Sequence, residues 1–180
     1  MKAATLVHTN LAYNAFVFGD CEHAQQHVDA GLSIALATGD ELELAWIRGN
    51  EGLVALFTGE PDRAVRAFSR ELEYARDHAY EEMLVEGLTG LAAVFTTRGR
   101  DAVTARLIGA IEALEIGSVG DATMQRLQED FFAAARERIG TPAWARGRAA
   151  GAGLDREATI ALALETARDL GERDAALTPH

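Results

Sequence analysis

The residues of this chain best suited to chemistry lie in the segment GDCEHAQQHVDAG, residues 19–31. It holds the only cysteine, Cys21, and two histidines four residues apart, His23 and His27. Side chains four apart share a helix face, so two imidazoles at this spacing could hold one metal ion. Zinc, however, takes three or four protein ligands. Cys21 reaches poorly toward His23 and no fourth ligand is near, so we predict no metal site.

The rest of the sequence lacks the patterns of common catalytic and cofactor-binding sites. It contains no HExxH, CxxC, GxSxG or GxGxxG motif, and no phosphate-binding GxxxxGK[ST] loop. Adjacent acids such as Glu81 and Glu82 point apart on a helix, so we interpret them as parts of solvated faces. We therefore expect no catalytic residues, no cofactor and no enzyme activity.

Composition and charge narrow the class of protein. The 180 residues are 48% hydrophobic, which suits one domain or a short repeat array, and the net charge is −11. An acidic chain repels phosphate backbones, so we expect no direct nucleic-acid binding, and no apolar run is long enough for a membrane span. A poor signal peptide and a lone cysteine indicate a cytoplasmic protein. We interpret four clustered arginines as a solvated face: Arg136, Arg138, Arg146 and Arg148.

Three segments of the chain repeat with a period of 40 residues. Each carries a glycine that can end a helix in the left-handed conformation, at Gly19, Gly59 and Gly99. Seven residues before each glycine stands a small residue that lets two helices approach closely: Ala12, Gly52 and Ala92. The pattern predicts helices over 3–18, 21–38, 41–58, 61–78, 81–98 and 101–116.

The second helix of each pair carries apolar residues at helical spacing, which favours an all-α fold. These stripes are Ala24, Val28, Leu32 and Ala35; Ala64, Phe68, Leu72 and Ala75; and Ile108, Ile111 and Leu114. One first-helix position departs from its equivalents, because Glu51 replaces Leu11 and Leu91. Glu51 could pair with Arg48 as a buried polar link or part of a site, or it could lie on an exposed face.

This pattern resembles the tetratricopeptide repeat in its longer, 40-residue (MalT-like) variety, over about residues 3–116. The third copy departs from it at Thr104, where the other copies have alanine. The resemblance implies an all-α superhelix of about three helical hairpins, at about 3–40, 41–80 and 81–116. We expect a single domain over 1–180, with a capping helical tail at 117–172 and a disordered end at 173–180.

The tail itself shows a further helical stripe, formed by Met124, Leu127, Phe131, Ala135 and Ile139. Gly140 would end that helix, and Thr141 and Pro142 suit the cap and first turn of the next. We expect Trp144 to anchor this short segment and a last helix to begin at or after Asp155.

The segments ARLIGAIEAL (105–114) and AWARGRAAGAGLDREATIALALE (143–165) carry a second resemblance. They are similar to the C-terminal end of large LuxR-type bacterial transcriptional regulators, which contain a central ATPase module. The chain has no phosphate-binding loop and no credible helix-turn-helix. The resemblance therefore implies either a fragment of such a regulator or a stand-alone relative.

The two resemblances together imply a non-catalytic protein-interaction or sensory module. Its partner would be a protein, a peptide or another domain of the same regulator, and a homodimer stays open. In tetratricopeptide arrays the first helices line the concave face, which implies a binding surface formed by Tyr13, Phe16, Trp46, Leu53, Phe57 and Glu86. The alternatives are that these side chains are core, or that the concave face senses a small molecule.

Overall fold

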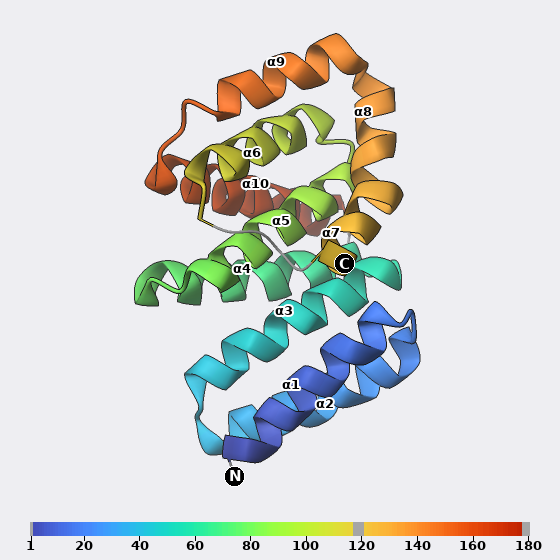
Figure 1. Ribbon diagram of the computed structural model, residues 1–180, viewed down its shortest axis with the longest axis vertical. Coiled ribbons are helices and arrows are strands. Elements are labelled where there is room, and N and C mark those ends of the chain that lie inside the picture. Colours follow the sequence, from blue (N-terminus) through green and yellow to red (C-terminus); the bar gives the residue numbers. More distant parts are fainter. Residues whose placement is uncertain (1, 117–120, 178–180) are drawn as a thin grey trace. The chain divides into compact units, whose positions relative to one another are not determined.

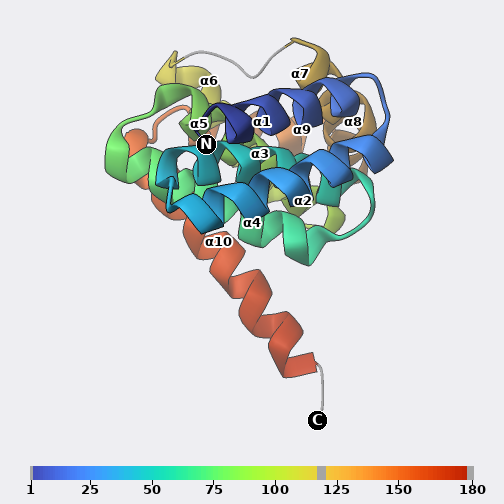
Figure 2. The same cartoon turned by 90° about the horizontal axis from the view of Figure 1, so that it is seen from below.

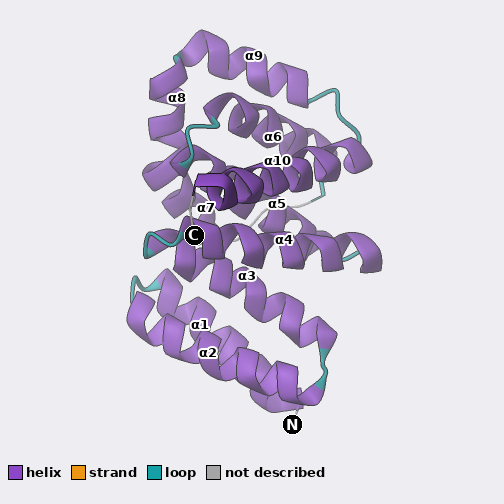
Figure 3. Cartoon of the chain, turned by 180° about the vertical axis from the view of Figure 1, so that it is seen from behind, coloured by secondary structure: helices purple, strands orange, loops and turns teal. Residues whose placement is uncertain are grey.

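A computed structural model of the chain describes residues 2–116 and 121–177. Within these ranges every regular element is a helix, which confirms the all-α class (Figure 3). The helices of the three expected pairs begin and end within one or two residues of their predicted positions. They are α1 (Lys2–Val17), α2 (Cys21–Thr38), α3 (Glu41–Phe57), α4 (Pro61–His78), α5 (Glu81–Thr97) and α6 (Asp101–Leu114).

The glycines at the 40-residue period end the first helices as predicted. Gly19, Gly59 and Gly99 have φ angles of 82°, 78° and 65°, in the region that glycine occupies without a steric penalty. Ala79, which ends α4, takes the same left-handed conformation at φ 57°, although its equivalent after α2 is Gly39. The turn geometry is therefore kept even where the sequence has lost its glycine.

The chain forms two compact units, Met1–Gly90 and Leu91–His180, and the boundary falls inside the continuous helix α5. In the first unit, α1 packs on α2, α3 packs on α4, and α2 packs against α3 (Figure 1). The ring of Phe68 in α4 fills the space beside two glycines, so that a β-carbon on Gly52 or Gly90 would overlap it. Small residues in the first helices thus admit a large one from the second.

A buried hydrogen bond also ties the first hairpin to the second. The Asn50 side-chain amide in α3 donates to the backbone carbonyl of Thr9 in α1 over 2.9 Å. Since both groups are buried, losing either would leave the other without its partner.

The second unit contains the rest of α5, α6 and the tail helices. These are α7 (Asp121–Leu127), the π-helical segment η1 (Gln128–Phe132), α8 (Ala133–Ile139), α9 (Thr141–Gly151) and α10 (Arg156–Leu177). α10 packs on α6 and runs on past the other helices of this unit (Figure 2). The expectation of disorder from residue 173 is wrong as far as Leu177, where α10 ends; residues 178–180 and 117–120 lie outside the described ranges.

Two further details of the tail correct the expectations from sequence. The hydrogen bonds of the π-helical segment span five residues instead of four, which shifts the register of the helix, and Phe132 is buried where Phe131 was expected in the stripe. Thr141 does not cap α9 but begins it, and Gly140 precedes it without a side-chain cap. Trp144 is buried, and α10 begins after Asp155, whose carboxylate accepts from the backbone N–H of Ala158, both as expected.

The helices α6 and α9 cross in close backbone contact because three glycines lie at the crossing. A β-carbon on Gly147 would lie 2.8 Å from the Ala105 Cβ. One on Gly109 or Gly151 would collide with backbone carbonyl groups of the facing helix. α9 therefore covers the face of α6 that carries Ala105 and Gly109.

Candidate functional site

The residues of the suspected metal site are engaged in helix capping and in a histidine pair. Asp20 caps α2 by accepting from the backbone N–H of His23, which is the main cause of its lowered pKa, and it contacts the His23 ring at 2.7 Å. The His27 Nδ1 lies 3.1 Å from the Nδ1 of His8 in α1, a partner that the sequence did not suggest. In the described ranges, no group of three or more histidine, cysteine or acidic residues could hold a metal ion.

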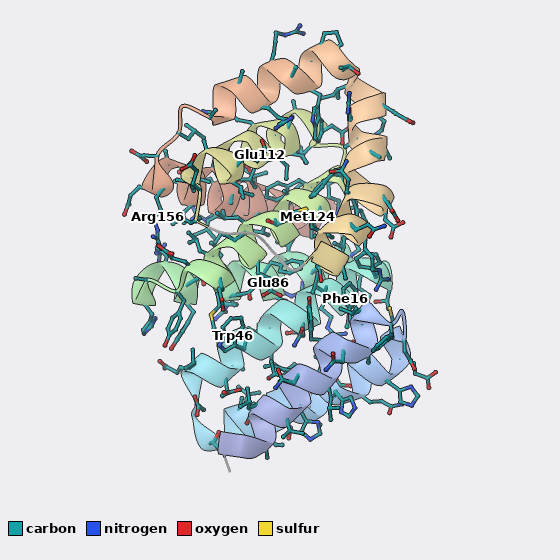
Figure 4. The ribbon with its side chains drawn as sticks, in the orientation of Figure 1. Phe16, Trp46, Glu86, Glu112, Met124 and Arg156 are labelled. Carbon is teal, nitrogen blue, oxygen red and sulfur yellow. The ribbon has the colours of Figure 1, made fainter. Side chains whose placement is uncertain are left out.

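The six residues expected to line a concave surface divide into core and part-exposed positions. Phe16 and Leu53 are buried, so they contribute to packing and cannot themselves line an open surface. The other four are Tyr13, Trp46, Phe57 and Glu86, and each keeps part of its side chain exposed. Phe16, Trp46 and Glu86 come from three different first helices (Figure 4).

The part-exposed ring of Phe57 packs against the buried ring of Phe16. Its ring meets the edge of Phe16 with centroids 5.1 Å apart, a favourable geometry for two aromatic rings. A part-exposed ring held in this way loses little freedom when a partner covers it.

Glu51, the acidic departure in the repeat, forms a polar link between helices. Its carboxylate accepts from Arg48, as expected, over 3.2 Å and from Arg63 in α4 over 3.0 Å. Arg63 also donates to Gln25 in α2 over 2.9 Å. This chain's own cations engage both oxygens of Glu51, which links α3 to α4 and, through Arg63, to α2 of the first hairpin. The arrangement favours the polar-link alternative.

The most unusual group in the first unit is Glu71, which the sequence analysis missed. Its side chain is fully buried, and neither carboxyl oxygen has a hydrogen-bond partner within the part of the chain that the structure describes. Burial, assisted by the nearby charge of Glu86, raises the pKa of Glu71 well above its usual value of 4.5. Burial and the neighbouring Glu82 raise the pKa of Glu86 to about 7.

Gly49 in α3 makes room for the Glu71 carboxyl group, because a β-carbon there would come within 2.9 Å of the Glu71 Cδ. A carboxyl group in such surroundings is held in its neutral form more readily than in water. A glutamate 22 residues after a glycine carries no recognisable motif, so only the fold reveals this contact.

In the second unit, two of the clustered arginines form ion pairs. Arg138 in α8 binds the buried carboxylate of Asp101 with two hydrogen bonds of 2.8 and 2.7 Å, which raise the Arg138 pKa. It also donates to the Thr96 carbonyl over 3.0 Å. Arg148 pairs with Glu112 in α6. All four clustered arginines are exposed, as expected for a solvated face, and two of them also form these ion pairs.

None of the helices in the described part combines the length and the apolar character needed to cross a membrane. Comparison of the chain with protein-family models, with curated proteins and with solved structures found no match.

Proposed function

We propose that this chain is a non-catalytic protein-interaction module built from tetratricopeptide-like helical hairpins. It would act in the cytoplasm as the C-terminal region, or a stand-alone relative, of a bacterial transcriptional regulator, without a cofactor and without contacting nucleic acid itself. Repeated helix–turn–helix units with left-handed residues at the turns support this proposal. In a superhelix of such units, the first helices would face a common concave surface.

The observation that carries the proposal is the set of aromatic side chains that the core leaves part-exposed on the first helices. They are Tyr13 in α1 and Trp46 and Phe57 in α3. Aromatic residues contribute most to binding energy at protein interfaces because they bury large areas at little entropic cost. Glu86 would add a carboxylate for a basic group. The fitting partner is a helix or extended peptide with apolar anchors and a basic residue.

Site-specific photocrosslinking in cells tests this proposal whatever the partner is. A benzophenone amino acid is placed at Tyr13 or Trp46, and at the exposed Asp77 of α4 as a control. We expect adducts of discrete mass from positions 13 and 46 and none from position 77. Equal labelling at all three positions, or none at 13 and 46, would argue against the proposed surface.

A companion variant separates binding from folding. Trp46→Ala should abolish capture of the crosslinked partner while it changes the melting temperature by only a few degrees. A loss of stability as large as that of a buried aromatic would instead assign Trp46 to the core. The small-molecule alternative stays a prediction, which thermal-shift screening against metabolites would check.

A further inference from the structure

Three helices of the first unit meet at the buried carboxyl group of Glu71 in α4. The helix α3 approaches it so closely that a β-carbon on Gly49 would come within 2.9 Å of the Glu71 Cδ. The helix α5 approaches α4 at the next residue, since a β-carbon on Gly87 would lie 3.1 Å from the Cβ of Leu72. Glu86, which precedes Gly87, is near enough to raise the pKa of Glu71. The side chain of Glu71 is therefore enclosed where α3, α4 and α5 come together.

Two further glutamates lie near Glu71 on α5. Glu86 is part-exposed, and the exposed Glu82, one helical turn before it, is close enough to raise its pKa. Within the described residues, none of these three carboxylates has an ion pair or a side-chain hydrogen bond, although arginines of α3 and α4 pair with other acids. We call Glu71, Glu82 and Glu86 the acidic group. Like charges this close favour the arrival of a cation, which the described part of the chain does not supply.

The buried member of the acidic group distinguishes it from an ordinary solvated face. Glu71 is fully buried, and neither of its carboxyl oxygens has a hydrogen-bond partner among the described residues. Even in its neutral form a carboxyl group carries a donor as well as an acceptor, so protonation alone does not satisfy it. A buried polar group without a partner destabilises the fold. Polar groups retained against stability are typical of binding and catalytic sites, where a ligand supplies the missing interaction.

Trp46 lies on the face of α3 that meets the acidic group. It precedes Gly49 by three residues, so the two share one face of the helix, and Gly49 is the residue against which Glu71 packs. Trp46 also occupies the position in the second repeat that Glu86 occupies in the third, 40 residues later (Figure 4). Its side chain is part-exposed. A part-exposed indole ring close to carboxylates suits a flat organic cation.

We propose that the acidic group and Trp46 together bind the guanidinium group of an arginine side chain. This inference rests on the proposed function, because the arginine would belong to the partner that covers the aromatic side chains of the first helices. It narrows the basic residue of that partner to one residue type and assigns it one place on the chain.

The chemistry of a guanidinium group fits this site better than that of an ammonium group. A guanidinium is planar, stacks on an indole ring, and has five N–H donors that reach two carboxylates at once. It is also hydrated more weakly than an ammonium, so it loses less when water is excluded. Glu82 and Glu86 would accept its hydrogen bonds because both are accessible. Glu71 is fully buried, so it would act through its charge, which is felt strongly in surroundings of low dielectric constant.

A metal ion is a poorer occupant of the acidic group. In the ranges that the structure describes, no three histidine, cysteine or acidic residues converge closely enough to hold one ion. The donors of a guanidinium group point in several directions, so its carboxylate partners need not converge on a single point. The spacing of the acidic group therefore favours an organic cation over a metal.

Titration with small arginine derivatives tests the proposal without knowledge of the partner. The full chain is labelled with 5-fluorotryptophan, and the fluorine signals of its two tryptophans, Trp46 and Trp144, are followed at constant ionic strength. The probes are N-acetyl-arginine amide, its lysine equivalent, and N-acetyl-citrulline amide, which keeps the shape of arginine without its charge. We expect the arginine probe to shift the Trp46 signal with a dissociation constant on the order of millimolar. The lysine probe should bind about threefold more weakly, citrulline should give no saturable shift, and the Trp144 signal should not respond.

Matched variants connect the binding to the acidic group. Glu86→Gln should weaken binding of the arginine probe about tenfold and Glu71→Gln about threefold, since each removes one charge and keeps nearly the same shape. Glu73→Gln, at an exposed position of α4, is the control and should leave the dissociation constant unchanged. Circular dichroism melts check that each variant is folded. Citrulline or lysine binding as tight as that of arginine, or an affinity that Glu86→Gln or Glu71→Gln leaves unchanged, would overturn the proposal.

The titration and the photocrosslinking experiment can fail separately. Saturable arginine binding that needs both glutamates, together with no crosslinks from positions 13 and 46, would retain the guanidinium site and reject the protein-binding surface. Discrete adducts from those two positions, together with no shift of the Trp46 signal by the arginine probe, would retain the surface and overturn the guanidinium site.

Discussion

The carboxyl group of Glu71 in α4 lies against the backbone of Gly49 in α3, where a β-carbon would come within 2.9 Å of the Glu71 Cδ. The glutamate is fully buried, and neither oxygen has a partner among the described residues. The contact between α3 and α4 therefore buries a carboxyl group at a position where most proteins have an apolar side chain. This relationship makes the stability of the first unit depend on pH.

Glu71→Gln should stabilise the protein at neutral and higher pH. The folded-state pKa of Glu71 lies above the usual value of 4.5, so its contribution to stability is fully present below pH 4.5 and is lost as the pH rises toward the folded pKa. The amide cannot ionise, and we expect a gain of about 1–3 kcal/mol at pH 8 in urea denaturation. Glu73→Gln, at an exposed position of the same helix, should change little. A loss of stability at pH 8 would contradict the prediction.

Glu86→Gln should flatten the pH dependence between about pH 4.5 and 7. The pKa of Glu86 is raised to about 7, so its favourable contribution is complete below pH 4.5 and declines up to that value. We expect an effect on the order of 1–2 kcal/mol, because the side chain is part-exposed and solvent screens its charge. Unfolding free energies measured at half-unit pH steps would check it. An unchanged slope in the variant would show that Glu86 titrates normally.

Gly49→Ala should destabilise the first unit by about 1–3 kcal/mol, because the added methyl group collides with the Glu71 carboxyl. Shortening the partner in Gly49→Ala/Glu71→Ala should recover part of the loss relative to Glu71→Ala alone. Gly171→Ala is the control, since a β-carbon there meets nothing and alanine favours a helix. Additive effects of the two substitutions would refute the contact.

Gly109→Ala and Gly151→Ala should each lower the free energy of unfolding by about 3 kcal/mol or more. Their β-carbons would meet backbone carbonyl groups across the α6–α9 crossing, and backbone cannot rotate aside. Gly153→Ala, two residues beyond the crossing in open space, should be nearly neutral. Differential scanning calorimetry of the three variants would compare them. Equal melting temperatures would mean that the helices separate at little cost.

The features predicted well from the sequence are those fixed by residues close together in the chain. The 40-residue spacing of Gly19, Gly59 and Gly99 predicted the helix ends, because each glycine acts on its own turn. The small residue of each first helix and the apolar stripe of each second helix also predicted buried positions, as at Ala12 and Phe68.

The features missed depend on pairs of residues far apart in sequence or on the hydrogen-bond pattern inside one helix. In the sequence Glu71 cannot be distinguished from a surface glutamate, because its burial depends on the contact with α3. Phe132 takes the core position expected for Phe131 because a π-helical turn shifts the register of the helix. No pattern of residues in the sequence predicted that turn. The exposure of the candidate binding residues could not be predicted from the sequence either. Phe16 and Trp46 are both aromatic residues of first helices, and only the packing of the helices shows that Phe16 is buried and Trp46 is part-exposed.

The crossing of α6 and α9 also has a consequence for how the chain is made. The two helices that meet at Gly109 and Gly151 are separated by the whole of α7, η1 and α8. A ribosome adds about 5–20 residues per second, so α6 emerges seconds before the helix that covers it. During that interval its apolar face is open to chaperones and to neighbouring nascent chains, whereas α1 and α2 can pair as soon as both have left the exit tunnel.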